Sequence, residues 1–179
     1  MKYMIASDIH GSAYYCEKLL EAFEREKADR LILLGDILYH GPRNDLPRDY
    51  APKKVIEMLN GMKDKIHCVR GNCDAEVDQM VLEFPIMADY AVFTEGKYTV
   101  YATHGHVYGP QNPPAKGVNM ILLSGHTHIP MCEVRDGVIC MNPGSVSIPK
   151  ENSEHSYMMW ENDVFVWRSL AGETYLEYK

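Results

Sequence analysis

Five short clusters of Asp, Asn, Cys and His residues carry side chains of the types that bind divalent metal ions. Each cluster directly follows a short apolar run, as Asp8 and His10 follow residues 3–6. Carboxylates, imidazoles and an asparagine oxygen together favour a borderline ion such as Mn, Fe, Co, Ni or Zn over Ca or Mg. In chain order the clusters are Asp8-Ile9-His10, Gly35-Asp36, Gly71-Asn72-Cys73-Asp74, Thr103-His104-Gly105-His106 and Gly125-His126-Thr127-His128.

These donors are too many for one metal ion. Asp8 and His10 are two residues apart, so on an extended strand their side chains would lie on one face, and the fourth and fifth clusters repeat this spacing. Asp36 is the candidate for a carboxylate that bridges two ions. Two ions roughly 3.5–4 Å apart lower the pKa of a shared water and hold phosphate oxygens, which suits in-line displacement at phosphorus. The clusters therefore predict a dinuclear site that hydrolyses phosphate esters.

Each cluster alone also has an ordinary structural explanation. Asp8 is a suitable cap for a following helix. Gly35-Asp36 is a usual strand-ending turn, and Asn72 is a usual turn residue. A single His is more often a surface residue than a ligand. The conjunction of five clusters, each after a predicted strand, favours the metal site over chance.

The elements that would position the clusters follow an α/β pattern and then a hairpin pattern. Ser12 is a candidate helix cap, and Pro52 suits the first turn of a second helix. Parallel strands in such βαβ units deliver their carboxyl ends to one crevice. The N-terminal part is predicted to contain strands at 2–6, 30–34 and 65–69, and helices at 13–27, from 52 onward and at 74–83.

The C-terminal part of the sequence predicts antiparallel pairs of strands. Asp136-Gly137 is a strong hairpin signal, and Glu95-Gly96 and Asn162-Asp163 separate two further pairs. Two mixed sheets packed face to face, with helices outside, accommodate both parts of the chain. The loops at 39–52 and 107–118 would shape the pocket. The predicted strands are 87–94, 97–103, 130–135, 138–141, 156–161, 164–170 and 173–178, with a further apolar run at 121–123.

Composition and charge restrict the class of partner. The chain has 179 residues and a formal net charge of −7, and we expect one domain over residues 1–179. An acidic protein is a poor non-specific binder of nucleic acid, and no run approaches the roughly 18–20 apolar residues of a membrane span. The N-terminal apolar run is too short for a signal peptide. The five cysteines are an odd number without a Cys-x-x-Cys pair, which favours reduced thiols and a cytoplasmic location.

The clusters, in this order, resemble the motifs of the calcineurin-like metallophosphoesterase superfamily, and most closely those of small bacterial YfcE-type phosphodiesterases. The resemblance extends from residue 1 to about residue 150. It implies a four-layer α-β-β-α sandwich and a metal-dependent phosphodiesterase with two divalent ions, for which Mn²⁺ is expected. The stretches that carry it are Ala6 to Ser12, Leu34 to Leu38, His40 to Asn44, Arg70 to Asp74, Thr103 to His106, Gly125 to Pro130 and Asn142 to Ser145.

The resemblance also implies roles for individual residues. His106 matches a motif position without being a usual ligand, and we expect it behind the ligands. Asp74 either orients a neighbour or caps the helix that follows. Arg43 and Asn44 are candidates for phosphate contact, because Arg suits phosphate oxygens. For the metal ions, the implied ligands are Asp8, His10 and His128 for the first, Asn72, His104 and His126 for the second, and Asp36 as the bridge.

Cys73 departs from the pattern of many superfamily members, which have His at this position. That His is proposed to protonate the leaving group, whereas a thiol is a weak donor. The departure predicts a preference for small diesters with leaving groups that depart without a proton, such as aryl esters. A packing role for Cys73 is the alternative.

Two other functions share these motifs. The first is a protein-binding scaffold of the same fold, like the retromer subunit. That subunit retains many of the motifs and, like this chain at Cys73, has no His after the Gly-Asn pair. A nuclease is disfavoured by the acidic charge and by the absence of a basic or aromatic module. Metal-dependent turnover of a small diester separates the enzyme from the scaffold. The hairpin-rich part offers edges for a homodimer or homotetramer.

Overall fold

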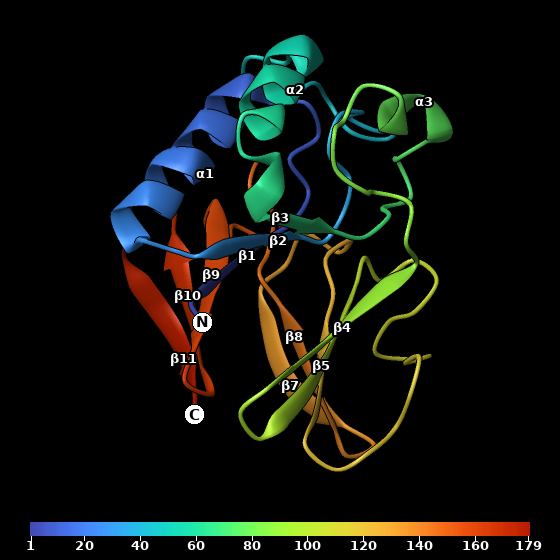
Figure 1. The fold of residues 1–179 in the computed structure, drawn as a ribbon, viewed down its shortest axis with the longest axis vertical. Coiled ribbons are helices and arrows are strands. Elements are labelled where there is room, and N and C mark those ends of the chain that lie inside the picture. Colours follow the sequence, from blue (N-terminus) through green and yellow to red (C-terminus); the bar gives the residue numbers. More distant parts are fainter.

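Two mixed β-sheets packed face to face form the centre of the molecule, which a computed structural model describes over residues 1–179 (Figure 1). In the first sheet the strand order is β11-β10-β9-β1-β2-β3, and in the second it is β4-β5-β6-β8-β7. The strands of the first sheet are β1 (Tyr3–Ala6), β2 (Arg30–Leu33), β3 (Ile66–Cys68), β9 (Ser156–Glu161), β10 (Val164–Ser169) and β11 (Thr174–Tyr178). Those of the second are β4 (Tyr90–Glu95), β5 (Tyr98–Thr103), β6 (Met120–Leu123), β7 (Met131–Arg135) and β8 (Val138–Asn142).

Both sheets combine parallel and antiparallel pairs. β1, β2 and β3 are parallel neighbours, and β9 joins β1 in the antiparallel sense. In the second sheet β5, β6 and β8 run parallel, while β4 and β7 are antiparallel at the two edges. The parallel strands come from the crossover connections that the sequence predicts, and the antiparallel ones come from the hairpins.

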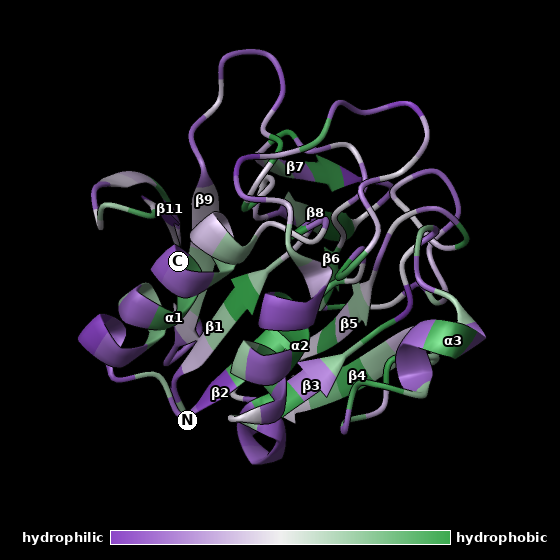
Figure 2. Ribbon diagram, turned by 90° about the horizontal axis from the view of Figure 1, so that it is seen from above, coloured by the Kyte–Doolittle hydropathy of each residue, from purple (hydrophilic) through white to green (hydrophobic).

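Two helices cover the outer face of the first sheet (Figure 2). In α1 (Ala13–Glu26), the hydroxyl of Ser12 accepts a hydrogen bond from the backbone N–H of Tyr15 at 3.2 Å, as the cap prediction requires. α2 (Pro52–Asn60) begins with Pro52 in its first turn, where a missing N–H leaves no helical bond unmade. These helix starts match the sequence prediction.

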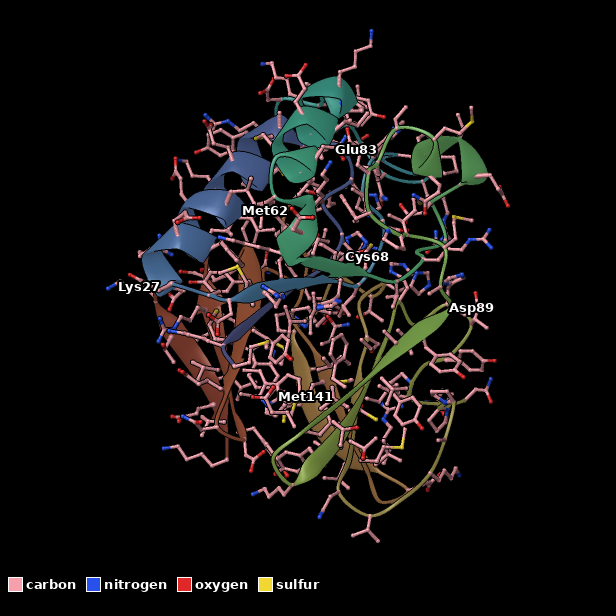
Figure 3. All side chains as sticks on the ribbon, viewed as in Figure 1. Lys27, Met62, Cys68, Glu83, Asp89 and Met141 are labelled. Atoms are coloured by element: carbon pink, nitrogen blue, oxygen red, sulfur yellow. The ribbon has the colours of Figure 1, made fainter.

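The core has a layer on each side of the first sheet. Met4 and Ala6 of β1 pack toward α1 and α2, while Tyr3 and Ile5 pack toward the second sheet. Met141, labelled in Figure 3, belongs to the layer between the sheets and is fully buried. Alternate residues of β1 therefore serve opposite layers, which explains why its sequence is apolar throughout.

The outer face of the second sheet is packed mainly by its own side chains and by a loop. Met120, Leu122, Val138 and Cys140 are buried there, and Ala115 of the 104–119 loop packs against them. This loop runs between the ends of β5 and β6, next to the predicted ligands, so its position shapes the site.

Most boundaries agree with the sequence prediction to within three residues, but the helix predicted at 74–83 is too long. The structure has α3 (Glu76–Gln79) and a short 3-10 helix at Lys63–Lys65. The side chain of Gln79 donates to the carbonyls of Leu82 and Phe84 and accepts from the N–H of Ile86, so it ends the helix and organises the next segment. None of the helices has the length and apolarity needed to cross a membrane.

Candidate metal centre

The predicted ligands converge because the loops after neighbouring strands continue the sheet ladder. The N–H of Asp8 donates to the carbonyl of Gly35 at 3.1 Å, and the N–H of His10 donates to the carbonyl of Asp36 at 2.9 Å. The loops that follow β1 and β2 are thereby held side by side. On the second sheet, the N–H of Gly125 donates to the carbonyl of His104 at 2.8 Å. The ends of β5 and β6 are joined in the same way.

Five of the predicted ligands have a left-handed backbone. Asp and His tolerate this conformation better than most residues, but it still strains the chain. Such strain persists where surrounding bonds hold it, and it is concentrated at functional sites. The φ angles are 60° at Asp8, 49° at His10, 57° at Asp36, 67° at His126 and 63° at His128.

Asp8, His10 and His128 form the first group of donors. Oδ1 of Asp8 lies 3.2 Å from Nε2 of His128 and 3.6 Å from Nε2 of His10. The two Nε2 atoms are 3.3 Å apart. All three side chains are buried. The resemblance assigns these three residues to one ion, and the structure brings their donor atoms together.

Asp36 lies between this group and a second one. Its Oδ2 is 3.6 Å from Nε2 of His10 and 3.4 Å from Nε2 of His104. Oδ1 of Asn72 is 3.0 Å from the same His104 nitrogen. The rings of His104 and His126 have centroids 5.1 Å apart, but His126 belongs to none of the groups whose donor atoms lie close together, so it stands at the edge of this arrangement. Asp36 is thus placed where a bridging carboxylate would be.

The hydrogen bonds of the imidazole rings fit a metal site. Nδ1 of His10, His104 and His128 contacts the backbone carbonyls of Tyr39, Leu34 and Ile148 at 2.6–2.7 Å. A carbonyl can only accept, so Nδ1 carries the proton and Nε2 offers its lone pair to the cluster.

An orphaned acceptor points to the same conclusion. Oδ1 of Asp8 is buried and has no hydrogen-bond partner, although buried polar atoms are nearly always paired. This oxygen lies close to Nε2 of His10 and Nε2 of His128. The lone pairs of these two nitrogens repel each other unless a cation lies between them. The donor set therefore fits a divalent ion.

The charges of the site are coupled. Burial alone would raise the pKa of Asp8, but the close side chains of His10, His128 and His104 outweigh burial and hold that pKa well below its usual range. Burial lowers the pKa of His104, but the carboxylates of Asp36 and Asp8 outweigh it and raise the pKa to about 9. Without metal, a proton on His104 supplies part of the positive charge that the carboxylates require.

Asp74 holds the two loops that carry Asp36 and Asn72. Its Oδ2 accepts from the N–H groups of Asp36 and Gly71 at 2.8 and 2.7 Å, and its Oδ1 accepts from Ile37 at 2.9 Å. Asp74 is buried and does not cap α3, which begins after Ala75. A Cβ at Gly71 would collide with the Asp36 carboxylate, so only glycine permits this approach.

Asn142 and two serines brace the other ligand loops. Nδ2 of Asn142 donates to the carbonyl of Gly125 at 2.8 Å and to the hydroxyl of Thr127 at 3.1 Å. The hydroxyls of Ser145 and Ser147 each donate to the carbonyl of Asp8 at 3.0 Å. The turn from Asn142 to Ser145 thus fixes ligand-bearing backbone.

A cavity of about 410 Å³ opens over the donor groups. Arg43 and Asn44 line it, as their candidate role in phosphate contact requires, although the Asn44 amide also donates to the carbonyl of His40 at 2.8 Å. Thr127 and Lys150 line it as well, and sequence reasoning missed both. Thr127 lies within a recognised motif, whereas no local pattern marks Lys150. The remaining lining residues are His10, Asp36, Gly41, Pro42, Asn72, Cys73, His126 and His128.

Cys73 and His106 occupy different sides of the centre. The backbone N–H of Cys73 donates to Oδ1 of Asp36 at 2.8 Å, and its thiol faces the cavity. Burial and the nearby Asp36 carboxylate raise the pKa of this thiol to about 12. The ring of His106 lies 5.3 Å from that of His104, is exposed, and lines a second cavity instead.

The profile of the calcineurin-like phosphoesterase superfamily domain matches residues 1–163. The chain belongs to this superfamily. It is 52% identical over 164 residues to phosphodiesterase YfcE of Escherichia coli, with 92% of this chain and 89% of that protein covered. The solved structure of the Escherichia coli phosphoesterase Yfce superposes with a TM-score of 0.95 at 49% identity, over 99% of this chain and 98% of that one. The expected fold, two mixed sheets with flanking helices, is confirmed.

The same fold occurs in a more distant protein. Vps29 of Entamoeba histolytica, solved in complex with zinc, superposes with a TM-score of 0.64 at 18% identity, over 99% of this chain and 98% of that one. This likeness concerns the fold alone.

The prediction of a phosphodiesterase of the metallophosphoesterase family is confirmed by the superfamily match and by the 52% identity to a phosphodiesterase. A family of this kind uses divalent metal ions, and the Asp and His groups here suit them.

Proposed function

We propose that this chain hydrolyses small phosphodiesters at a site for two divalent metal ions, with Mn²⁺ as the working ion. The observation that carries the proposal is the position of Asp36, whose Oδ2 lies 3.6 Å from Nε2 of His10 and 3.4 Å from Nε2 of His104. A carboxylate between two donor groups suits a bridge between two ions. The proposed ligands are Asp8, His10 and His128 for one ion, Asn72, His104 and His126 for the other, and Asp36 for both.

The two ions, when bound, would make a shared water acidic enough to attack phosphorus near neutral pH and would neutralise charge on the phosphate oxygens. The protein's own residues position the substrate. Arg43 and Lys150 line the cavity over the donor groups and attract an anionic phosphate. The buried carboxylates of Asp8 and Asp36 stay ionised, because their pKa values are lowered by the surrounding histidines.

The residue types in the cavity support aryl diesters as the best substrates. Cys73 stands where many superfamily members have His, and a thiol is a weak hydrogen-bond donor. General-acid assistance is typically worth roughly 10²–10⁴ in rate, so a site without it favours leaving groups that need no proton. Alkyl esters would react more slowly for this reason.

We further propose that the chain is one domain over residues 1–179, acting in the cytoplasm. All five cysteines are free, and Cys16 and Cys68 are buried in the core layer between the first sheet and its helices, where they serve as packing residues. The charge of −7 argues against a nuclease, since a nuclease must attract a polyanion.

Hydrolysis of bis(4-nitrophenyl) phosphate by metal-stripped protein, with and without Mn²⁺, tests the proposal. Turnover should appear with Mn²⁺ and disappear in Asp36→Asn, because an amide is a poor bridge between two cations. The matched control is Asp64→Asn, the same change at an exposed position of the 3-10 helix. No turnover with Mn²⁺, Co²⁺, Ni²⁺ or Zn²⁺ in folded protein that binds metal would favour the binding scaffold instead.

A further inference from the structure

A second cavity, also about 410 Å³, lies next to the first. His126 and Thr127 line both cavities, so the two cavities share this segment of the chain as part of their walls. Its volume falls within the roughly 300–1,000 Å³ of small-molecule sites. The 105–112 segment of the loop after β5 forms one wall, and Met131 and Arg135 of β7 contribute to another.

The two cavities differ in their chemistry. The first contains Arg43 and Lys150 beside the metal donors and suits an anion. The second has a single charged residue, Arg135, and its Nε is paired with Oε1 of Glu133 at 2.5 Å. The positive charge of Arg135 is therefore neutralised locally. An uncharged group suits the second cavity better than a second phosphate does.

Most of the exposed wall surface of the second cavity is apolar. Gly105 and Gly109 expose backbone without side chains, and Val107 and Met131 add aliphatic and thioether surface. Thioether sulfur makes favourable contacts with aromatic rings. Gln111 and Asn112 stand at the same cavity with amides that both donate and accept hydrogen bonds. Nδ2 of Asn112 already donates to the carbonyl of Val107 at 3.4 Å, and both residues are exposed, so water can pair their remaining polar atoms. A heteroaromatic ring can replace that water through the polar atoms at its edge, whereas an alkyl chain cannot.

The loop that forms this cavity is held in place. Gly109 and Asn112 exchange backbone hydrogen bonds at 2.9 and 3.3 Å. The hydroxyl of Thr103 donates to the carbonyl of Tyr108 at 2.9 Å. A wall anchored at both places keeps its shape before a ligand arrives, which lowers the entropy cost of binding.

We propose that the second cavity binds a planar, uncharged heteroaromatic group of the phosphodiester whose phosphate occupies the first cavity. The inference rests on the proposed function, because the catalytic cavity supplies the phosphate position. His126 and Thr127 would lie under the link between ring and phosphate. The substrate class is then a diester with one heteroaromatic substituent, for which a nucleobase is a suitable probe.

Two esters with the same leaving group test the inference. Thymidine 5′-(4-nitrophenyl) phosphate carries a base, and methyl 4-nitrophenyl phosphate does not. The first should have the higher kcat/KM by roughly 2- to 13-fold, the range that one contact between a thioether sulfur and an aromatic ring contributes. Val107→Trp, which fills the cavity, should remove this advantage. Val118→Trp is the matched control, since Val118 belongs to the same loop, is 91% exposed and lines neither cavity.

The outcomes separate the inference from the proposed function. A loss in Val107→Trp confined to the thymidine ester supports the inference. An equal loss for both esters overturns it, because methyl 4-nitrophenyl phosphate carries no base for the second cavity. Values equal to those of Val118→Trp for both esters overturn it, while turnover of bis(4-nitrophenyl) phosphate keeps the proposed function. If wild-type protein hydrolyses no ester, the proposed function fails. Calorimetry of millimolar thymidine with metal-free protein then decides, and equal binding by the two variants overturns the inference.

Discussion

Asp74 is expected to act by positioning the ligand loops and not by chemistry, and Asp74→Asn tests this distinction. The carboxylate accepts three backbone N–H groups at 2.7, 2.8 and 2.9 Å. In the variant, the amide oxygen can take the place of Oδ2 and still accept the hydrogen bonds from the backbone N–H groups of Asp36 and Gly71. Its NH₂ group then faces the N–H of Ile37, so one buried donor loses its acceptor.

The loss can be converted into a shift in Tm. An unsatisfied buried donor costs about 1–3 kcal/mol, and for a chain of this size each kcal/mol lowers Tm by roughly 2–4 °C. We expect Asp74→Asn to lower the Tm of metal-free protein by about 2–12 °C. Asp74→Ala removes all three acceptor contacts and should lower it further. Asp64→Asn, at the surface, should leave Tm unchanged within about 1–2 °C.

Activity provides the second measurement. A displaced Asp36 should weaken Mn²⁺ binding, so the variant should need more Mn²⁺ for half-maximal rate and recover much of its kcat when saturated. The pH profile of kcat should keep its shape, because Asp74 gives no proton to the substrate. A fall in kcat of a hundredfold or more at saturating Mn²⁺, with unchanged Tm, would refute the positioning role and show direct catalysis.

Four further results are expected. The pKa of His104 is raised to about 9 from 6.5 in the folded, metal-free protein. The protonated ring therefore stabilises this form fully below pH 6.5, and the stabilisation is lost as the pH rises through 9. The Tm measured in the presence of a chelator should fall over this pH interval. Since Mn²⁺ must displace that proton, its affinity by calorimetry should rise with pH up to about 9, and a flat profile would contradict the assignment of His104. Cys73, with a thiol pKa of about 12, should react slowly with iodoacetamide at pH 8 in metal-free protein and faster with Mn²⁺; equal rates would show that the thiol is remote from the ions. Cys73→His should accelerate alkyl esters more than aryl esters, and equal changes would count against the missing-acid explanation.

Local signals account for the parts of the fold that the sequence predicts. Ser12 and Pro52 mark helix starts through the chemistry of the first turn, which depends on few neighbours. Asp136 and Gly137 both have the positive φ of a tight hairpin, at 49° and 80°, as the sequence pair indicates. The end of α3 depends instead on Gln79 reaching across to Leu82, Phe84 and Ile86, and no periodicity shows such a contact.

The candidate site also has a part that local sequence signals predict and a part that depends on long-range contacts. Motif positions are predictable because the ligands follow strands that must end at one edge, and the structure brings Asp8, His10 and Asp36 together there. Lys150 lines the cavity because the backbone after β8 returns to the ligand loops. There the N–H of Lys150 donates a hydrogen bond to the carbonyl of His128 at 3.2 Å. Such long-range placement leaves no trace in the local sequence. The second cavity escaped prediction for this reason too.

The left-handed backbone at the ligand positions has a consequence for how the protein relates to its ions. Hydrogen bonds that the Asp74 carboxylate accepts, and others that Asn142 and Ser145 donate, hold these loops without any contribution from metal. Removing the ions should therefore leave the architecture standing, unlike in small domains that fold only around their zinc. A chain built in this way can lose catalysis by exchanging a few donor atoms and still keep its surface. Hydrolysis and folding are separable properties here, and selection can act on either one alone.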